Sequence, residues 1–485
     1  MRLRNPKTFY RANPDISTRL DGNKAAILFH PDSNQENLLN ASGLFIWKLL
    51  DGSLSVGEIS DRIQQHFVVS TTYDQILDEV NDFLVDLEKL DFASSFNSPL
   101  TSLKNPKGYP DIHDSPQSVD ISITGKCNLH CQYCFYANEM QSRQDLPTDQ
   151  WLSFFEELGQ LAVRDVCLSG GEVFIRPDLW DLIDGIIANR MRYSMLTNGT
   201  VITEKTLVPF ETGKRRKRLK SIQVSIDGSC PEIHDKSRGK GSFNKAVKGL
   251  RLLKEAGFPI AIRVTVNRYN VDDLENVARF LLDDIGLNSF STNDAMPMGA
   301  AACFNRESIT LLPEQQLKAM KTLSRLAEKY NGRITATAGP LAKWHSFREM
   351  EQAKATGKKS TRWQMGSLTA CGGVFSKLAV HHDGVFSPCN MLSGVELGTI
   401  NTDSIKEIWM SHPTLKDLRE RRKIPMNKVS GCDDCEWAPY CNGSCPGLAY
   451  EMTGNFKLAS PHDCYRIFLK ETGLHSIFDA DERKC

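Results

Sequence analysis

The sequence contains no long apolar run and no excess of charge of either sign. None of its 485 residues lies in an apolar segment long enough to span a bilayer. The start, MRLRNPKTFYRANPD, lacks the apolar core of a signal peptide. The 59 basic side chains balance 59 acidic ones, so no net field favours nucleic acid or an anionic membrane surface. We therefore expect a soluble, cytosolic protein that binds neither nucleic acid nor a membrane.

Cysteine, by contrast, is abundant. A reducing cytosol disfavours disulfides, so fourteen cysteines point to metal or redox chemistry. Their placement supports this, because three fall between Cys127 and Cys134 and seven fall between Cys371 and Cys464. The remaining four are scattered and are interpreted as ordinary thiols, namely Cys167, Cys230, Cys303 and Cys485.

Residues 1–98 have the pattern of a small, winged-helix-like module with one strand and three helices. The strand is AAILFH, and the amphipathic helices are LNASGLFIWKLL, SVGEISDRIQQHF and TTYDQILDEVNDFLVDLEKL. Asp51-Gly52, after the first helix, predicts a helix stop or a turn. Residues 99–117 are rich in Ser, Pro and Asn and predict a linker.

Residues 118–313 alternate short apolar strands with helical segments. The predicted strands are VDISI, RDVCLS, YSMLT, SIQVSID, IAIRVTV and NSFSTN. This alternation predicts an α/β fold with a parallel sheet. Six units are fewer than the eight of a closed barrel, so we expect a partial (β/α)6 barrel of the TIM type, with its site at the carboxyl ends of the strands. Residues 314–370 predict a helical bridging segment, 371–470 a loop-rich cysteine domain and 471–485 a tail.

The first cysteine group stands directly after the first barrel strand. Cys127, Cys131 and Cys134 have the spacing C-x3-C-x2-C. Three thiolates can hold three irons of a 4Fe–4S cluster and leave the fourth iron open to a small molecule. A structural zinc site is the alternative, but it needs four ligands, and no fourth cysteine or well-spaced histidine lies nearby.

These residues resemble the signature of the radical S-adenosylmethionine (SAM) superfamily, C-x3-C-x-aromatic-C, in which Tyr133 takes the aromatic place. The resemblance implies that the open iron chelates SAM and that its reductive cleavage gives a 5′-deoxyadenosyl radical, which abstracts hydrogen from a substrate. It also implies the residues that contact SAM. Gly170, Gly171 and Glu172, after the second strand, match the motif that holds the SAM amino group. Ser225 resembles the residue that reaches its ribose or carboxylate, and Arg238 resembles the residue that pairs with its carboxylate.

The second cysteine group resembles the SPASM domain, which carries two auxiliary 4Fe–4S clusters. The resemblance implies that Cys371, Cys389 and Cys445 hold cluster I, and that cluster II is held by Cys432, Cys435, Cys441 and Cys464. With the first group this makes three clusters. Some family members have a further cysteine just before the position of Cys371, which this sequence lacks, so cluster I has an open iron or borrows a ligand. A zinc ribbon is the alternative for the four-cysteine run C-x2-C-x5-C-x3-C alone.

The N-terminal module resembles the leader-peptide recognition domain typified by the chaperone of pyrroloquinoline quinone biosynthesis (PqqD). The resemblance implies that the leader of a precursor peptide binds there, as a strand added to a sheet edge. The alternative is a module used only for packing or dimer contacts.

These patterns together predict a radical SAM maturase of a ribosomally synthesised precursor peptide, with an external electron donor such as flavodoxin or ferredoxin. Crosslinking, epimerisation and backbone excision all remain open as outcomes. Two other functions also remain open. One is residue oxidation in the manner of sulfatase maturases, or cofactor biosynthesis; the other is a non-catalytic iron–sulfur redox sensor.

Overall fold

The computed structural model describes residues 5–22, 24–67, 70–101, 108–138, 140, 144–303 and 309–479. Contacts divide the chain into two compact units. One holds Met1–Gln117 with Phe155–Arg164 and Gly185–Arg192. The other holds Ser118–Phe154, Asp165–Asp184 and Tyr193–Cys485.

The N-terminal module contains two small antiparallel sheets and three helices. One sheet has the order β2-β3-β4 and the other the order β5-β1-β6. The strands are β1 (Phe9–Ala12), β2 (Ser17–Asp21), β3 (Ala25–His30), β4 (Gln35–Leu39), β5 (Asp51–Ser55) and β6 (Ala93–Phe96). The helices are α1 (Ala41–Lys48), α2 (Val56–His66) and α3 (Tyr73–Lys89).

Local sequence explains where these helices begin. Ser55 and Glu58 form a reciprocal capping box at the start of α2, and Thr72 and Gln75 form another at the start of α3. Each helix then buries one stripe, which in α3 runs from Ile76 through Val80 and Leu84 to Leu87.

The predicted AAILFH strand is β3, and the three predicted helices are present. The sequence analysis missed the other five strands, which are four or five residues long. The helix stop predicted at Asp51-Gly52 is confirmed, since α1 ends at Lys48, but the alternative of a turn is wrong, because both residues belong to β5, which pairs with β1.

A ten-stranded sheet organises the second unit. Its order is β13-β12-β11-β10-β9-β8-β7-β14-β15-β16. The six predicted strands are consecutive neighbours in it: β7 (Ser118–Thr124), β8 (Asp165–Gly170), β9 (Arg192–Thr197), β10 (Leu219–Ser225), β11 (Ile260–Val266) and β12 (Phe290–Asp294). The partial barrel expected from the sequence is confirmed.

Each end of the six-stranded core is extended by strands that the sequence analysis did not identify. β13 (Ile334–Ala336) pairs parallel to β12. At the other end β14 (Lys377–Val380) pairs parallel to β7, and β15 (Val385–Ser387) and β16 (Gly398–Thr399) continue antiparallel. The cysteine-rich segment therefore contributes directly to the barrel sheet.

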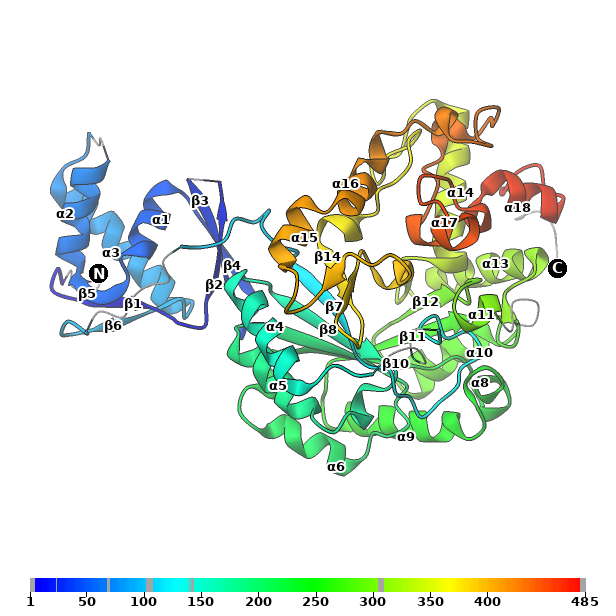
Figure 1. Cartoon of the computed structure of the whole chain (residues 1–485), viewed down its shortest axis with the longest axis horizontal. Coiled ribbons are helices and arrows are strands. Elements are labelled where there is room, and N and C mark those ends of the chain that lie inside the picture. Colours follow the sequence, from blue (N-terminus) through cyan, green and yellow to red (C-terminus); the bar gives the residue numbers. More distant parts are fainter. Residues whose placement is uncertain are drawn as a thin grey trace. The chain divides into compact units, whose positions relative to one another are not determined.

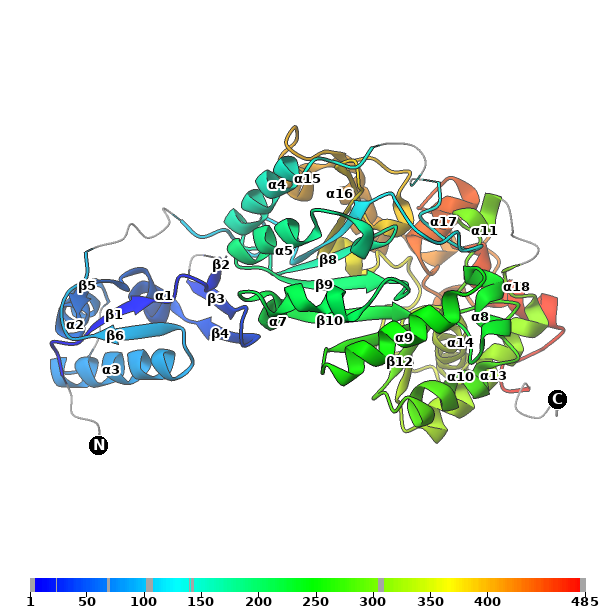
Figure 2. The same cartoon turned by 90° about the horizontal axis from the view of Figure 1, so that it is seen from below.

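Helices cover the outer side of the strands (Figures 1 and 2). The predicted ones are α4 (Thr148–Gln160), α5 (Leu179–Ala188), α9 (Ser242–Glu255) and α10 (Leu274–Arg279), which continues as a π-helical turn over Phe280–Asp284. Short helices not predicted are α6 (Glu204–Leu207), α7 (Arg215–Arg218), α8 (Pro231–Arg238) and α11 (Ala300–Cys303). The helical bridging segment contains α13 (Pro313–Lys329) and α14 (Gly339–Thr356) with β13 between them.

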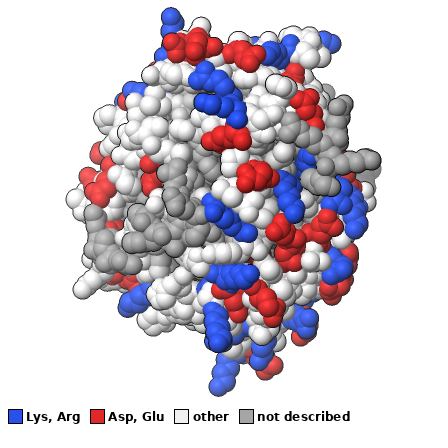
Figure 3. All heavy atoms as spheres, turned by 90° about the vertical axis from the view of Figure 1, so that its right-hand side faces the viewer, with Lys and Arg blue, Asp and Glu red and all other residues white. Residues whose placement is uncertain are grey.

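The C-terminal region is built from short elements, as expected where a metal cluster replaces part of a hydrophobic core. Its helices are α15 (Ile405–Ser411), α16 (Pro413–Glu420), α17 (Pro446–Thr453) and α18 (Tyr465–Thr472). Aromatic side chains join α14 to this region, with Phe347 stacked on Tyr465 at a centroid distance of 4.4 Å. Among the described residues no helix is long and apolar enough to cross a membrane. Basic and acidic side chains are interspersed on the face drawn in Figure 3.

Candidate functional site

A cavity of about 1350 Å³ opens at the carboxyl ends of the barrel strands. Cys127, Cys131 and Cys134 line it, together with Cys371, Cys441 and Cys445 from the second cysteine group. Of the predicted SAM contacts, Tyr133, Gly170, Gly171, Ser225 and Arg238 line the same cavity. Segments more than three hundred residues apart in sequence thus meet around one space.

The loop that carries the first cysteines is held against the end of β8. The backbone N–H of Gly171 donates to the carbonyl of Thr124 at 2.8 Å, and that of Glu172 donates to the carbonyl of Lys126 at 2.9 Å. Gly170 has a φ of +116°. A Cβ atom on Gly170 would lie 2.4 Å from the Thr124 oxygen, and one on Gly171 would lie 1.9 Å from the Lys126 oxygen. Only glycine permits so close an approach of the two segments.

Burial shapes the chemistry of the three thiols. It raises the pKa of Cys131 to about 12 and also raises the pKa of Cys127. The Cys127 sulfur accepts from the Leu129 N–H at 3.5 Å and from the Asn198 amide at 3.9 Å. Such donors favour a thiolate, which is the form that binds iron.

Within the described residues, no three His, Cys, Asp or Glu side chains converge on a point that could hold a single metal ion. The six cysteines on the cavity wall offer soft sulfur ligands, which suit iron–sulfur clusters as well as zinc.

Glu172 is fully buried and does not line the cavity. Its carboxylate accepts from the Thr197 hydroxyl at 2.7 Å and the Asn198 N–H at 2.8 Å. The pKa of Glu172 is raised by burial, against the effect of these hydrogen bonds. In the described geometry, Glu172 therefore holds the loop after β9 in place. A direct contact between Glu172 and a SAM ammonium stays a prediction.

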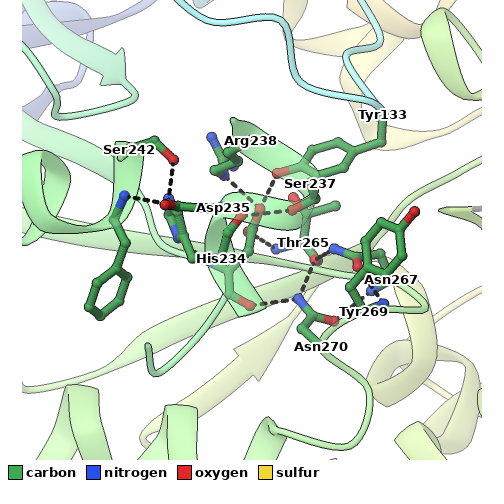
Figure 4. A network of polar contacts seen from close by, with 12 residues as sticks. Tyr133, His234, Asp235, Ser237, Arg238, Ser242, Thr265, Asn267, Tyr269 and Asn270 are labelled. Atoms are coloured by element: carbon green, nitrogen blue, oxygen red, sulfur yellow. Dashed lines mark hydrogen bonds and ion pairs between the residues drawn. The ribbon is translucent and has the colours of Figure 1, made fainter. Parts of the chain in front are cut away.

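Arg238 is oriented by a buried carboxylate that the sequence analysis missed. The Arg238 Nε donates to Asp227 at 2.6 Å, and the Tyr133 hydroxyl donates to the same oxygen (Figure 4). The guanidinium also lies over the Tyr133 ring, 5.5 Å from its centroid. Burial alone would lower the pKa of Arg238, but Asp227 and Tyr133 raise it. Arg238 is thus a fixed cation at the cavity wall, suited to a carboxylate.

The environment of Asp227 is fully polar. Its second carboxylate oxygen accepts from the Thr265 N–H at 2.8 Å, and its carbonyl accepts from the Asn270 amide at 2.8 Å. The backbone N–H of Asp227 donates to Nδ1 of His234, whose pKa is lowered to about 4 by burial and then by Arg238. Because His234 is neutral, it does not compete with Arg238 for an ion pair with the Asp227 carboxylate. The signal in the sequence was the SIDG run, in which Asp227 follows Ser225 by two residues.

The inner face of the barrel is polar. Ser225 lines the cavity at the end of β10, and Gln223 lies one pleat below it. On β11, Arg263 and Thr265 alternate in the same way, and Arg263 pairs in register with Ser225. Sequence reasoning missed Gln223, Arg263 and Thr265, although the period of two in IAIRVTV already places Arg263 and Thr265 on one face.

The seven later cysteines fall into two groups of electrostatic neighbours. Burial raises the pKa of Cys389 to about 12, and the nearby thiols Cys445 and Cys371 add to the shift. In the same way burial raises the pKa of Cys441 to about 11, with further effects from the other three members of its group, Cys464, Cys432 and Cys435. These are the sets that the SPASM resemblance implies for clusters I and II. Iron binding by each set stays a prediction.

Arg421 holds the loops of the second cysteine group together. It is fully buried and donates to the backbone carbonyls of Thr369, Phe456 (2.6 Å), Leu458 (2.8 Å) and Ser444 (3.3 Å). Thr369 lies two residues from the predicted ligand Cys371, and Ser444 lies next to the predicted ligand Cys445. Burial lowers the pKa of Arg421 to about 10, which leaves it charged at neutral pH.

Family models match three parts of the chain. Residues 121–281 match the radical SAM superfamily, residues 25–92 match coenzyme PQQ synthesis protein D (PqqD), and residues 371–436 match the SPASM iron–sulfur cluster-binding domain. The chain is a radical SAM enzyme of the SPASM class. This radical SAM enzyme carries its PqqD domain on the same chain. The cofactors of its class are SAM and iron–sulfur clusters.

Relatives of the radical SAM enzyme differ in what their names say they do. It is 27% identical to an AdoMet-dependent heme synthase of Methanosarcina barkeri, over 73% of this chain and 97% of that protein. It is 35% identical to the mycofactocin maturase MftC of Mycolicibacterium smegmatis, over 34% of this chain and 41% of that protein.

Two solved structures share the fold of the enzyme. Streptococcus suis SuiB bound to the precursor peptide SuiA matches with a TM-score of 0.62 and 14% identity, over 94% of this chain and all of that one. The protein anSMEcpe with bound AdoMet matches with a TM-score of 0.53 and 20% identity, over 76% of this chain and all of that one.

Replacing Gly171 with alanine tests the contact between β8 and the cysteine loop. The new Cβ meets a backbone carbonyl, so the loop must shift, and we expect a destabilisation of about 3 kcal/mol or more. Anaerobic reconstitution of G171A should give less iron per chain and a lower melting temperature. Gly394→Ala is the matched control, because nothing lies within 4 Å of its Cβ position. Equal iron contents in the two variants would refute the argument.

Asp227→Asn removes the charge that balances Arg238. An unpaired buried cation is costly, so we expect SAM to bind at least about tenfold more weakly, measured by equilibrium dialysis with labelled SAM. Asp235→Asn is the control, since Asp235 lies on the helix that carries Arg238 but accepts from Ser242 and Phe243 instead. A D227N enzyme with wild-type SAM affinity would contradict the role assigned to this pair.

Arg421→Leu leaves several buried carbonyls without donors, each at a cost of about 1–3 kcal/mol. We expect lower thermal stability and loss of iron from the second cysteine group, measured by differential scanning calorimetry and iron analysis. The neighbouring Arg422→Leu serves as control, because Arg422 is exposed and lies over the Phe375 ring. If R421L retained full iron and stability, these carbonyl contacts would be dispensable.

Proposed function

We propose that this enzyme modifies a ribosomally made precursor peptide, whose leader binds the N-terminal module and whose core enters the barrel cavity. The observation that carries the proposal is the PqqD match at residues 25–92 on the same chain as the radical SAM and SPASM matches. The fold shared with SuiB over 94% of this chain, in a structure that contains a precursor peptide, supports it.

The small sheet β2-β3-β4 offers an edge for the leader. Its β2 edge is bridged by the chain itself, since Leu20 pairs with Asp111. Strand β4 pairs with β3 alone among the described strands, and Leu38 on it is 69% exposed. An extended leader could add to β4 through backbone hydrogen bonds, with an apolar side chain against Leu38. A bound leader would raise the effective concentration of the core peptide at the cavity.

The residues of the cavity divide the remaining work. When bound, the cluster at the first cysteine group and SAM supply a 5′-deoxyadenosyl radical that takes a hydrogen atom from the substrate. Gly170 and Gly171 let the cysteine loop pack against the end of β8, Ser225 binds the ribose or carboxylate of SAM, and the Asp227-oriented Arg238 binds its carboxylate. The guanidinium of Arg238 lies over the Tyr133 ring, which supports it.

We propose three 4Fe–4S clusters in all. The first has an open iron for SAM. Cluster I would be held by Cys371, Cys389 and Cys445, of which Cys371 and Cys445 line the cavity, and its fourth iron would be open or take a borrowed ligand. An external flavodoxin or ferredoxin would deliver the electron. Cluster I could hold the substrate or take up the electron left after hydrogen abstraction.

A second candidate function is tetrapyrrole cofactor biosynthesis. It is favoured by the heme synthase of Methanosarcina barkeri, which aligns over 97% of its own length. The two candidates differ in what binds the N-terminal module. A peptide leader must bind it in the first case and not in the second.

The deciding experiment is anaerobic incubation of the reconstituted enzyme with SAM, reductant and a short peptide encoded beside its gene. We expect 5′-deoxyadenosine together with a change in peptide mass, unless the outcome is epimerisation, which leaves the mass unchanged. Loss of a hydrogen pair would mean a crosslink or oxidation, and loss of a larger fragment would mean backbone excision. An enzyme with Cys127, Cys131 and Cys134 replaced by alanine is the control. Conversion of iron coproporphyrin III, with no effect on any peptide, would overturn the proposal in favour of the second candidate.

Leu38→Lys tests the β4 edge directly. The charge should weaken binding of the candidate leader, labelled for fluorescence anisotropy, by about tenfold, because the apolar contact is lost. Leu90→Lys is the control, since Leu90 is also exposed in the N-terminal module but lies at the end of α3. Unchanged leader affinity in L38K would rule out this edge as the binding site.

A further inference from the structure

The charges that line the cavity are almost all paired. Arg238 contacts Asp227, and Arg362 contacts Glu349 at 2.9 Å. Lys343 is shared between two acids. It lies 2.8 Å from Asp463 and 3.6 Å from Asp294, and these contacts hold the pKa of both carboxyls below the usual range in spite of burial.

Arg263 differs from these cations. It is half-buried on β11, lines the cavity, and has no ion pair or side-chain hydrogen bond with any described residue. Burial, with no compensating acid, lowers its pKa. Its strand neighbours in register are Ser225 on one side and Ser291 on the other, so they provide no carboxylate.

An unpaired guanidinium that is partly removed from water is costly in free energy. The protein contains a contrasting case, because the buried Arg421 satisfies its donors with backbone carbonyls. Arg263 has no such partners among the described residues, and it lines the cavity. The planar fork of a guanidinium matches a carboxylate in two parallel hydrogen bonds.

A second unsatisfied group lies close to Arg263. The side-chain oxygen of Asn293 is buried and has no hydrogen-bond partner among the described residues, although the residue lines the cavity. Asn293 stands on β12 opposite Thr265, whereas Arg263 stands opposite Ser291. Arg263 and Asn293 are therefore diagonal neighbours on adjacent parallel strands, and both line the cavity.

We propose that Arg263 and Asn293 form a substrate subsite that binds a carboxylate beside an N–H group. A peptide provides this combination at an aspartate or glutamate side chain or at its C-terminal residue. The subsite deepens the function proposed above and rests on the cavity being the place where the peptide is modified. The subsite predicts that the substrate residue at the reacting position, or the one next to it, is acidic.

Arginine footprinting of the SAM-bound, cluster-loaded enzyme tests the subsite without knowledge of the natural substrate. Phenylglyoxal would label accessible arginines, and peptide mapping by mass spectrometry would quantify Arg263. The probes are an acetylated tripeptide amide, Ala–Glu–Ala, and its glutamine counterpart, with coproporphyrin III and its tetramethyl ester as a second pair. Arg362 lines the same cavity and is the internal control for simple blocking.

We expect the glutamate tripeptide to protect Arg263 and the glutamine tripeptide to leave it reactive, with Arg362 labelled equally in both. Protection by SAM alone would assign Arg263 to the cofactor and overturn the proposal. Equal protection by acid and amide, or protection of Arg362 to the same degree, would also overturn it. Protection by coproporphyrin III alone would show that Arg263 binds a carboxylate but would contradict the proposed peptide function. This result therefore distinguishes failure of the subsite from failure of the proposed function.

Affinity measurements with variants complete the test. Arg263→Gln should weaken binding of the glutamate tripeptide by about tenfold or more and abolish its advantage over the glutamine tripeptide. Arg263→Lys should restore part of that advantage, because it keeps the charge but not the fork. Asn293→Ala should weaken both tripeptides alike. A preference for the acid that survives in R263Q would show that another residue reads the carboxylate.

Discussion

The approach of the β8 end to the first cysteine loop is the contact on which the site depends. Two glycines allow the backbones to meet at distances that no side chain could tolerate, and the N–H groups of Gly171 and Glu172 then tie the loop to the strand. Because the same loop carries three of the cavity's thiols, a backbone contact fixes where a cluster would sit. Glu172 extends this effect, since its buried carboxylate ties the β8 turn to the β9 turn.

Sequence patterns predicted the six central strands and the residues around the cluster because both depend on local signals. Apolar runs of five to seven residues between helices are read easily, and cysteine spacing reflects chemistry that little else requires. Strands of two to five residues, such as β13 and β16, carry too little periodicity to be seen. Their existence depends on a partner strand far away in the sequence.

The buried polar groups show the same limit. Arg238 was recognised by its motif. Its partner Asp227 could be assigned only from the folded structure, in which the end of α8 brings Arg238 to this carboxylate. Arg421 had no motif at all, since its partners are carbonyls from three separate loops. Ser225, Arg263 and Asn293 each belong to a different strand, and only their registers bring them to one wall. Long-range polar networks of this kind are set by topology, which a linear pattern does not contain.

The pairing of β14 with β7 has a consequence for how the enzyme can be divided. β7 lies in the interior of the sheet only because Lys377–Val380 occupies its outer side. Removing the chain from that point onward would turn β7 into an edge strand with a row of unpaired N–H and C=O groups, the template on which chains associate. The cysteine-rich segment therefore provides a strand that the barrel sheet requires. In evolution it could be elaborated or lose its clusters, but it could not be discarded without a replacement strand.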